Sequence, residues 1–431
     1  MALFDVPDPL DRRPGKLPGD LDAFDPRFRW NWPKRTGASL GGTSASGRQA
    51  LPGWGVALAR PFAPPLSYAP LETALHAANF QPTELLSGSL PAFSGGAGTY
   101  GVPLSAAPTA VLYNVQAFAA ARLPPPPAEW TVDDFEKTCA ALVGAMRGGR
   151  VPQCYAVLPA LVGWSSWTVQ AGKTSYRMDW AGQLVDANVW GAFVLGYGGS
   201  VVRYGRFDLS DPGAMRGLAR LVAIARAYGA GPQYTPHQQA DVARLLAGAA
   251  MRFGTYNGGP APAGFRYARF PRLPVRPVVP ATLLGVEPAQ MGPGGEGWRP
   301  AYSAKGIPIQ ALEATVAYAR WVYHALRSDP HTPGTLPPVL SDGAVQRAYF
   351  GAAARVADGA GSIGAWRHYV FVQQGWPRTP RAKPSAYPFT NAAQWQVFAA
   401  LTDVVRGGAP LAGSLARAAR ILNGLPRTAG G

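Results

Sequence analysis

Residues 101–142 read GVPLSAAPTAVLYNVQAFAAARLPPPPAEWTVDDFEKTCAAL, and this stretch decides the fold class. Its first part, Gly101 to Asn114, combines apolar and small residues with prolines, which indicates two short extended pieces separated by a turn. Its last part has the signals of a helix start. Thr131 is an N-cap residue with Asp134 three residues later, so we predict a helix that runs to about Met146.

Further helices and short strands are predicted on both sides of this stretch. Asp211 followed by Pro212 marks a helix that ends at Gly229, because apolar residues repeat between them at helical spacing. Other helical patterns cover Tyr68 to Ala78, the residues after Pro308, Asn391 to Val405 and Ser414 to Leu422. Apolar segments with the length of strands are Tyr155 to Leu158, Met251 to Gly254 and Val275 to Leu284. The alternation predicts an α/β architecture with ligand sites at strand ends and lobe junctions.

Length and composition limit the classes of function. A chain of 431 residues is long enough for two or three domains, and 47% hydrophobic residues with 13 Trp predict that most of it folds. The formal net charge of +16 favours an anionic partner, but the arginines are scattered among Ala, Gly and Pro and form no basic stripe. We therefore expect no nucleic-acid partner.

Cysteine and histidine usage gives no sign of a metal site. The two cysteines, Cys139 and Cys154, either pair with each other in an oxidising compartment or serve as buried thiols, and the sequence leaves both open. The five histidines show no HExxH or other ligand spacing. Neither a metal nor another cofactor is predicted.

The N-terminal residues give few structural signals. Met1 to Gly55 is rich in Pro, Gly, Ser and Arg, which predicts an irregular, loop-dominated segment. Arg12 and Arg13 are not followed by an apolar stretch, so no signal peptide is recognised in this sequence. No apolar run approaches the roughly 18 residues of a membrane-spanning helix. Either the chain is cytoplasmic or its export signal is missing from this version.

Five segments, in chain order, resemble the family 1 extracellular solute-binding proteins of ABC transporters, the group that contains maltose-binding and other sugar-binding receptors. The matching features include a strand ending in Tyr-Asn, Trp-Thr opening a helix, Gly-Gly at the start of a hairpin, and a C-terminal helical pair. The five segments are residues 101–142, 188–232, 245–260, 301–326 and 398–425. That family opens with a strand, a helix and a second strand, which Met1 to Gly55 does not supply. The sequence therefore leaves open whether the first lobe is complete at its start.

The resemblance implies an α/β, two-lobed, periplasmic-binding-protein-like fold of type II, with an interlobe cleft and hinge strands. It places one hinge connection in the crossing strand, at Val111, Leu112 and Tyr113. The expected division of the chain is an irregular segment at 1–55, a first lobe at 56–112 plus 280–330, and a second lobe at 113–279 plus 331–431.

A sugar has hydroxyl groups at its rim and apolar C–H faces, so its receptor needs flat aromatic rings and planar polar side chains. Tyr256 and Asn257 follow a predicted strand and precede Gly258 and Gly259, which allow close backbone approach. Similarity to the family makes these two the first ligand candidates. Further candidates, for each of which ordinary packing is the alternative, are Trp164, Trp167, Trp190, Tyr302 and Trp366.

The resemblance also implies a receptor that is not an enzyme. It captures a small solute, a sugar or oligosaccharide, by hinge closure and delivers it to the membrane permease subunits of an ABC importer. We expect a monomer located outside the cytoplasm, in the periplasm or at the cell surface.

Two other classes compete with this interpretation. A carbohydrate-active enzyme would need two carboxylates across one bond, and no acidic pair lies near the candidate aromatic residues in the sequence. A basic nucleic-acid or surface-binding module would show binding that falls steeply with salt, unlike the capture of a neutral sugar.

Overall fold

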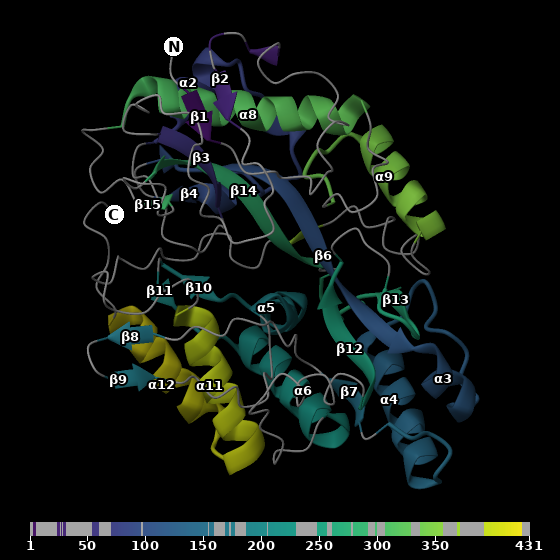
Figure 1. Ribbon diagram of the computed structural model, residues 1–431. Helices are drawn as coiled ribbons and strands as arrows, with labels where there is room; N and C mark the ends of the chain where they lie inside the picture. Colours follow the sequence, from purple (N-terminus) through teal and green to yellow (C-terminus); the bar gives the residue numbers. More distant parts are fainter. Residues whose placement is uncertain are drawn as a thin grey trace. The chain divides into compact units, whose positions relative to one another are not determined.

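A computed structural model gives the structure of the chain, which forms two compact units (Figure 1). Unit 1 comprises Met1–Ala107, Leu283–Ala352 and Gly430–Gly431, and unit 2 comprises Pro108–Thr282 and Ala353–Ala429. The residues that the structure describes are 3–5, 24, 25, 27, 29–31, 54–59, 70–95, 98–153, 155–158, 169–171, 174–176, 187–204, 206–229, 248–256, 261–276, 279–291, 298, 299, 307–328, 337–356, 369, 370 and 392–424.

The boundaries between the units differ in detail from those expected. The chain passes from unit 1 to unit 2 at Ala107–Pro108 and back at Thr282–Leu283, where the sequence predicted 112/113 and 279/280. Residues 331–352 were expected in the second lobe, but they belong to unit 1. Bridges join Leu340 to Leu85 and Pro338 to Ser105, and such long-range pairing leaves no local signal in the sequence.

The sheet of unit 1 has the strand order β2-β1-β3-β14. Its strands are β1 (Leu3–Asp5), β2 (Arg29–Asn31), β3 (Trp54–Ala59) and β14 (Val279–Met291), the last of which begins in unit 2. β1 is parallel to β2 and β3, and β3 is antiparallel to β14. The prediction of an irregular N-terminal segment is therefore wrong at β1 and β2. Three-residue strands have no periodicity of their own and are defined by the strands that they pair with.

A single strand, β6 (Val102–Asn114), occupies the region where two pieces and a turn were predicted. Pro103 and Pro108 suggested the turn, but a proline in a strand loses only its N–H donor. Both carbonyl oxygens still accept hydrogen bonds, from the Tyr323 hydroxyl and from the Tyr256 N–H, respectively. The two prolines therefore interrupt neither the strand nor its contacts.

The main helix of unit 1 is α8 (Ile309–Ser328), which confirms the helix predicted after Pro308. It packs on β3 and on α2 (Glu72–Ala77), and most of its residues are buried, because its apolar face is wide and its exposed polar residues lie in one stripe. Burial raises the pKa of Tyr323 well above its usual value. The remaining elements of unit 1 are β4 (Ser94–Gly95), β5 (Gly98–Thr99), β15 (Trp298–Arg299), single 3₁₀ turns at Pro82–Glu84 and Pro91–Phe93, and α9 (Gly343–Val356), whose last residues belong to unit 2.

In unit 2, β6 pairs on both edges. β12 (Ala249–Thr255) and β13 (Phe265–Arg269) are both antiparallel to it, and β7 (Tyr155–Leu158) lies parallel beyond β12. The predictions of strands at 155–158 and 251–254 are confirmed. The strand predicted from Val275 begins four residues later, at Val279, and the Val275 side chain is 59% exposed in a bend.

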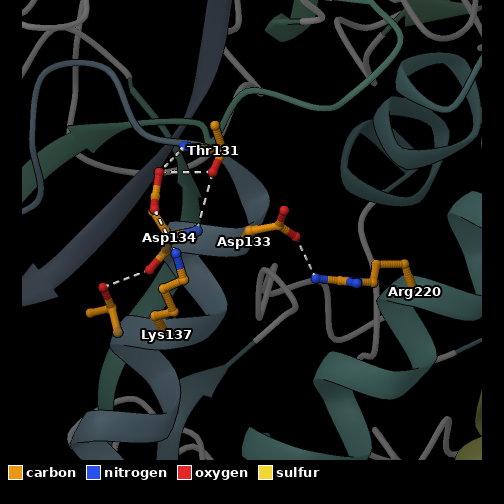
Figure 2. Close-up of polar contacts among 6 residues, drawn as sticks. Thr131, Asp133, Asp134, Lys137 and Arg220 are labelled. Carbon is orange, nitrogen blue, oxygen red and sulfur yellow. Dashed lines mark hydrogen bonds and ion pairs between the residues drawn. The ribbon is translucent and has the colours of Figure 1, made fainter.

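Helix α4 (Val132–Arg147) confirms the prediction made from its N-cap (Figure 2). The Thr131 hydroxyl accepts the Asp134 N–H at 3.2 Å, and the Asp134 carboxylate accepts the Thr131 N–H at 3.0 Å. Arg220 binds Asp133 at 2.7 Å and thereby ties this end of α4 to α6 (Pro212–Tyr228). One face of α4 enters the core, where Phe135 packs on Phe253 with ring centroids 5.5 Å apart.

Helix α6 confirms the prediction of a helix from Pro212 to Gly229, and Asp211 caps it through the N–H groups of Gly213 and Ala214. It crosses α5 (Ala187–Gly196) at very short range. A Cβ built on Gly217 would lie 2.3 Å from the carbonyl oxygen of Phe193, so only glycine fits at this crossing. The hairpin expected after Gly198-Gly199 is present as β10 (Val202–Arg203) and β11 (Arg206–Phe207).

The last two helices confirm the predicted C-terminal pair. α11 (Ala392–Gly407) packs on α12 (Leu411–Gly424), and α12 holds β11 through Asn423, whose side chain makes two 2.9 Å hydrogen bonds with the backbone of Phe207. The other elements of unit 2 are α3 (Val115–Ala121), β8 (Val169–Ala171), β9 (Thr174–Tyr176) and β16 (Tyr369–Val370).

Candidate functional site

The structure describes two of the seven predicted ligand residues, Tyr256 and Trp190, and both lie in unit 2. The other five lie outside the described residues: Trp164, Trp167, Asn257, Tyr302 and Trp366. The geometry of a candidate site therefore has to be built around Tyr256, which follows the last residue of β12.

Tyr256 is held firmly at the end of β12. Its N–H donates to the carbonyl of Pro108 at 2.8 Å, which fixes its backbone against β6. Its ring meets the ring of Tyr267 edge to face, with centroids 5.1 Å apart and an interplanar angle of 88°. The residue is 0% exposed. In this structure the ring supports the strand end and offers no free face to a solute, so its part in binding stays a prediction.

Trp190 lies in α5 and is also 0% exposed. Its neighbours in the helix, Val189 and Phe193, are equally buried, and Phe193 meets Phe270 edge to face at 6.3 Å. This is the environment of a core residue, which was the stated alternative for Trp190.

Strand register places Tyr256 on a face with an unusual composition. Arg252 and Tyr267 both pair with Leu112, from opposite edges of β6, and directly paired residues point to the same side of a sheet. The side chains alternate along each strand, so the set on this side can be read from the register. We call this set the Arg252 face. It consists of Arg252 and Gly254 of β12, Tyr256 directly after β12, Ala110, Leu112 and Asn114 of β6, and Phe265, Tyr267 and Arg269 of β13.

The guanidinium of Arg252 lies beside an aromatic ring of this face. Its guanidinium carbon lies 4.7 Å from the centroid of the Phe265 ring, within the range of a cation–π contact. Burial lowers the pKa of Arg252, while the nearby Tyr267 acts in the opposite direction. Burial also raises the pKa of Tyr267. The second guanidinium of the face, that of Arg269, is paired with Glu129 at 2.9 Å.

The sequence contained one signal of this face that was missed. In the strand predicted at 251–254, Arg252 is the single basic residue between Met251 and Phe253, and alternation puts it on the side opposite to these two core residues. The approach of Phe265 and Tyr267 had no such signal, because it depends on both strands pairing with β6.

Comparisons with known proteins identify the fold. No family model and no curated protein matches the chain. A sugar transporter protein from Rhizobium etli, in an open conformation, is similar over 99% of this chain and 99% of its own, with 12% identity and a TM-score of 0.57. A substrate-binding protein of an ABC transporter from Listeria monocytogenes, in complex with cycloalternan, covers 94% of this chain and 92% of its own, at 14% identity and a TM-score of 0.55. The chain has the two-lobed α/β fold of ABC-transporter solute-binding proteins.

A third structure with this solute-binding-protein fold is a sugar-binding protein from Xanthomonas citri. It is similar over 85% of this chain and 82% of its own, with 14% identity and a TM-score of 0.52. The expected fold class is thereby confirmed. At such identity the likeness concerns the fold, and residues of the site have to be argued from this chain alone.

The hinge residues predicted from this fold family lie inside unit 2. Val111, Leu112 and Tyr113 are buried in β6 and are paired with β12 and β13 on both edges. The chain crosses from unit 1 to unit 2 within β6 at Ala107–Pro108, before these three residues. It crosses back within β14 at Thr282–Leu283. Long strands that pass between lobes are the places where a solute-binding-protein fold can bend.

The described residues hold no group of three or more His, Cys, Asp or Glu that could bind a metal ion. Cys139 is a free, fully buried thiol in α4, and burial raises its pKa well above the usual value. Cys154, for which the sequence left a pairing with Cys139 open, lies outside the described residues. In the part of the chain that the structure describes, no helix is long and apolar enough to cross a membrane.

Proposed function

We propose that this chain is the solute receptor of an ABC importer. It captures a small solute, a sugar or oligosaccharide, by hinge closure and delivers the solute to the permease subunits in the membrane. The protein works outside the cytoplasm and as a monomer, and its action is conformational and not catalytic: an open form admits the solute and a closed form retains it.

One observation carries this proposal: the fold likeness to solute-binding proteins extends over 94 to 99% of the chain in two structures. One of them is in complex with cycloalternan, and the other is described as a sugar transporter. In this chain the long strands β6 and β14 each contribute residues to both units. These strands support a receptor that opens and closes.

Ligand-induced stabilisation tests the proposal. The purified chain is heated in the presence of a panel of mono- and oligosaccharides, and the melting temperature is compared with that of the free protein. A ligand at a hundredfold its dissociation constant stabilises the folded state by about 2.7 kcal/mol. Stabilisation by at least one sugar is the expected result, with calorimetric titration to confirm one site per monomer. A panel without any stabilising or titrating sugar contradicts the receptor function.

Substitutions test the residues proposed to contact the solute. We expect W164A, W167A and N257A each to weaken binding of the sugar found in the screen by about tenfold or more, since losing a stacked ring or a buried hydrogen bond costs about 1.4 kcal/mol or more. The control is Y204A, because Tyr204 is an aromatic residue that is 88% exposed in the turn between β10 and β11. If all four variants bind the sugar equally well, Trp164, Trp167 and Asn257 do not contact it.

The competing enzyme function has its own test. Oligosaccharides that stabilise the protein are incubated with it and then separated by chromatography. We expect the sugars to be recovered unchanged, because a receptor releases what it binds. Cleavage products that form with the protein and are absent from the same incubation without it would show a carbohydrate-active enzyme in place of a receptor.

A further inference from the structure

One positive charge in unit 2 is not balanced by any described neighbour. Arg252 lies in the middle of β12, partly buried, with strands on both sides. Within the described residues its guanidinium makes neither an ion pair nor a hydrogen bond, and its contact is with the ring of Phe265. A guanidinium carries five N–H donors, so most of its bonding capacity is unused there.

The other residues of the Arg252 face supply no compensating charge. None of the nine residues of the face is acidic, and two of them are arginines. Arg269, the second arginine, is paired with the carboxylate of Glu129. Arg252 is therefore the cation of this face for which the described residues provide no carboxylate.

A partly buried cation without an anion is costly, because burial disfavours its charged form. The contact with Phe265 offsets part of this cost, since a cation–π contact is weaker than a charge-assisted pair with an anion. Arg252 also retains solvent exposure, so a ligand can reach its donors. The partly exposed ring of Phe265 beside it provides an apolar surface for the body of that ligand.

We propose that the Arg252 face binds an anionic group of the captured solute, a carboxylate or a phosphate, through a forked pair of hydrogen bonds from Arg252. The receptor then prefers an acidic or phosphorylated sugar to the neutral sugar of the same configuration. This inference rests on the proposed receptor function and specifies the class of its solute.

Matched pairs of probes test the preference. Binding is measured by calorimetric titration for neutral sugars, for the corresponding uronic acids and for the corresponding sugar phosphates, for example D-glucose, D-glucuronate and D-glucose 6-phosphate. Inorganic phosphate alone is titrated as well. We expect the anionic probes to bind about tenfold to a hundredfold more tightly than the neutral ones, the ratio expected for a charge-assisted pair. The uronic acid and phosphate arms identify which anion the site takes.

Substitution of Arg252 assigns the preference to this residue. R252Q is expected to lose the tighter binding of the anionic probe and to retain binding of the neutral sugar. R252K keeps the charge but not the fork, and its affinity for the anion is expected to lie between the two. The control is R203Q: Arg203 also lies over an aromatic ring, 5.2 Å from the centroid of Tyr204, but on an exposed hairpin.

Each result has a distinct meaning. Equal binding of neutral and anionic probes, or an anion preference that R252Q keeps, overturns the inference and leaves the receptor function standing. Absence of binding by every probe contradicts the receptor function itself, and the inference with it. R252K also serves if R252Q fails to fold, because its anion affinity must fall relative to the wild type while neutral binding is retained.

Discussion

Replacement of Gly217 by alanine gives the sharpest test of the packing in unit 2. A Cβ at this position would lie 2.3 Å from the carbonyl oxygen and 2.6 Å from the carbonyl carbon of Phe193. These are backbone atoms of α5, which no side-chain rotation can move away, so the two helices must separate. Overpacking costs typically about 1–3 kcal/mol, and the higher helix propensity of alanine returns about 1 kcal/mol. Because the clash is with backbone atoms, the cost lies at the upper end of this range, and we expect G217A to lower the free energy of unfolding by about 2 kcal/mol.

Gly144 provides the matched control, because it is also a glycine inside a helix of unit 2. It lies on the exposed side of α4, and a Cβ there would meet nothing within 4 Å. G144A therefore gains the helix propensity without a clash, and it should raise stability by about 1 kcal/mol. Both variants are unfolded in urea and followed by far-ultraviolet circular dichroism, and their midpoints are compared with the wild type. If G217A proves as stable as G144A, the close crossing of α5 and α6 does not exist.

Two further predictions concern α4. T131A removes the N-cap and should lower the free energy of unfolding by about 1 kcal/mol at neutral pH, measured by the same urea titration. Hydrogen bonds from Thr131 lower the pKa of Asp134 below its usual 3.8. The stability that the Asp134 carboxylate contributes is therefore present above pH 3.8 and is lost as the pH falls through its lower pKa in the folded protein. The difference in free energy of unfolding between T131A and the wild type should therefore narrow in acid. A difference that widens in acid would contradict this assignment. Cys139 should resist a thiol reagent at pH 8 in the native protein and react in urea, because its thiol is buried and its pKa raised; peptide mass spectrometry that finds labelled Cys139 in native protein would refute the burial.

Helix starts were the part of the fold that the sequence predicted best. Thr131 with Asp134, and Asp211 with Pro212, gave the N-termini of α4 and α6, because caps act on backbone groups within one turn. Short apolar segments such as 155–158 gave strands with the observed bounds. These signals are local, so one segment of sequence is enough to reveal them.

The errors arose where structure depends on distant partners. β1 and β2 were predicted as loop because three residues have no period, and their pairing with β3 defines them. Pro103 and Pro108 suggested a turn in β6, yet a strand tolerates proline where no N–H has to donate. The Arg252 face was missed for the same reason, since Arg252 and Phe265 meet only because β12 and β13 pair with opposite edges of β6.

The same pairing restricts where a receptor with this fold can bend. Rotation of the backbone at Val111, Leu112 or Tyr113 would break hydrogen bonds to β12 and to β13 at once, since both strands pair with these residues. Pro108 has its φ angle fixed by its ring, which removes one of the two free dihedral angles at the start of unit 2. The hinge at 111–113 stays a prediction, and the pairing of these residues on both edges argues against bending there. We infer that closure turns the backbone at the passages between units, at Ala107 in β6 and at Thr282–Leu283 in β14, while the Arg252 face moves as part of unit 2.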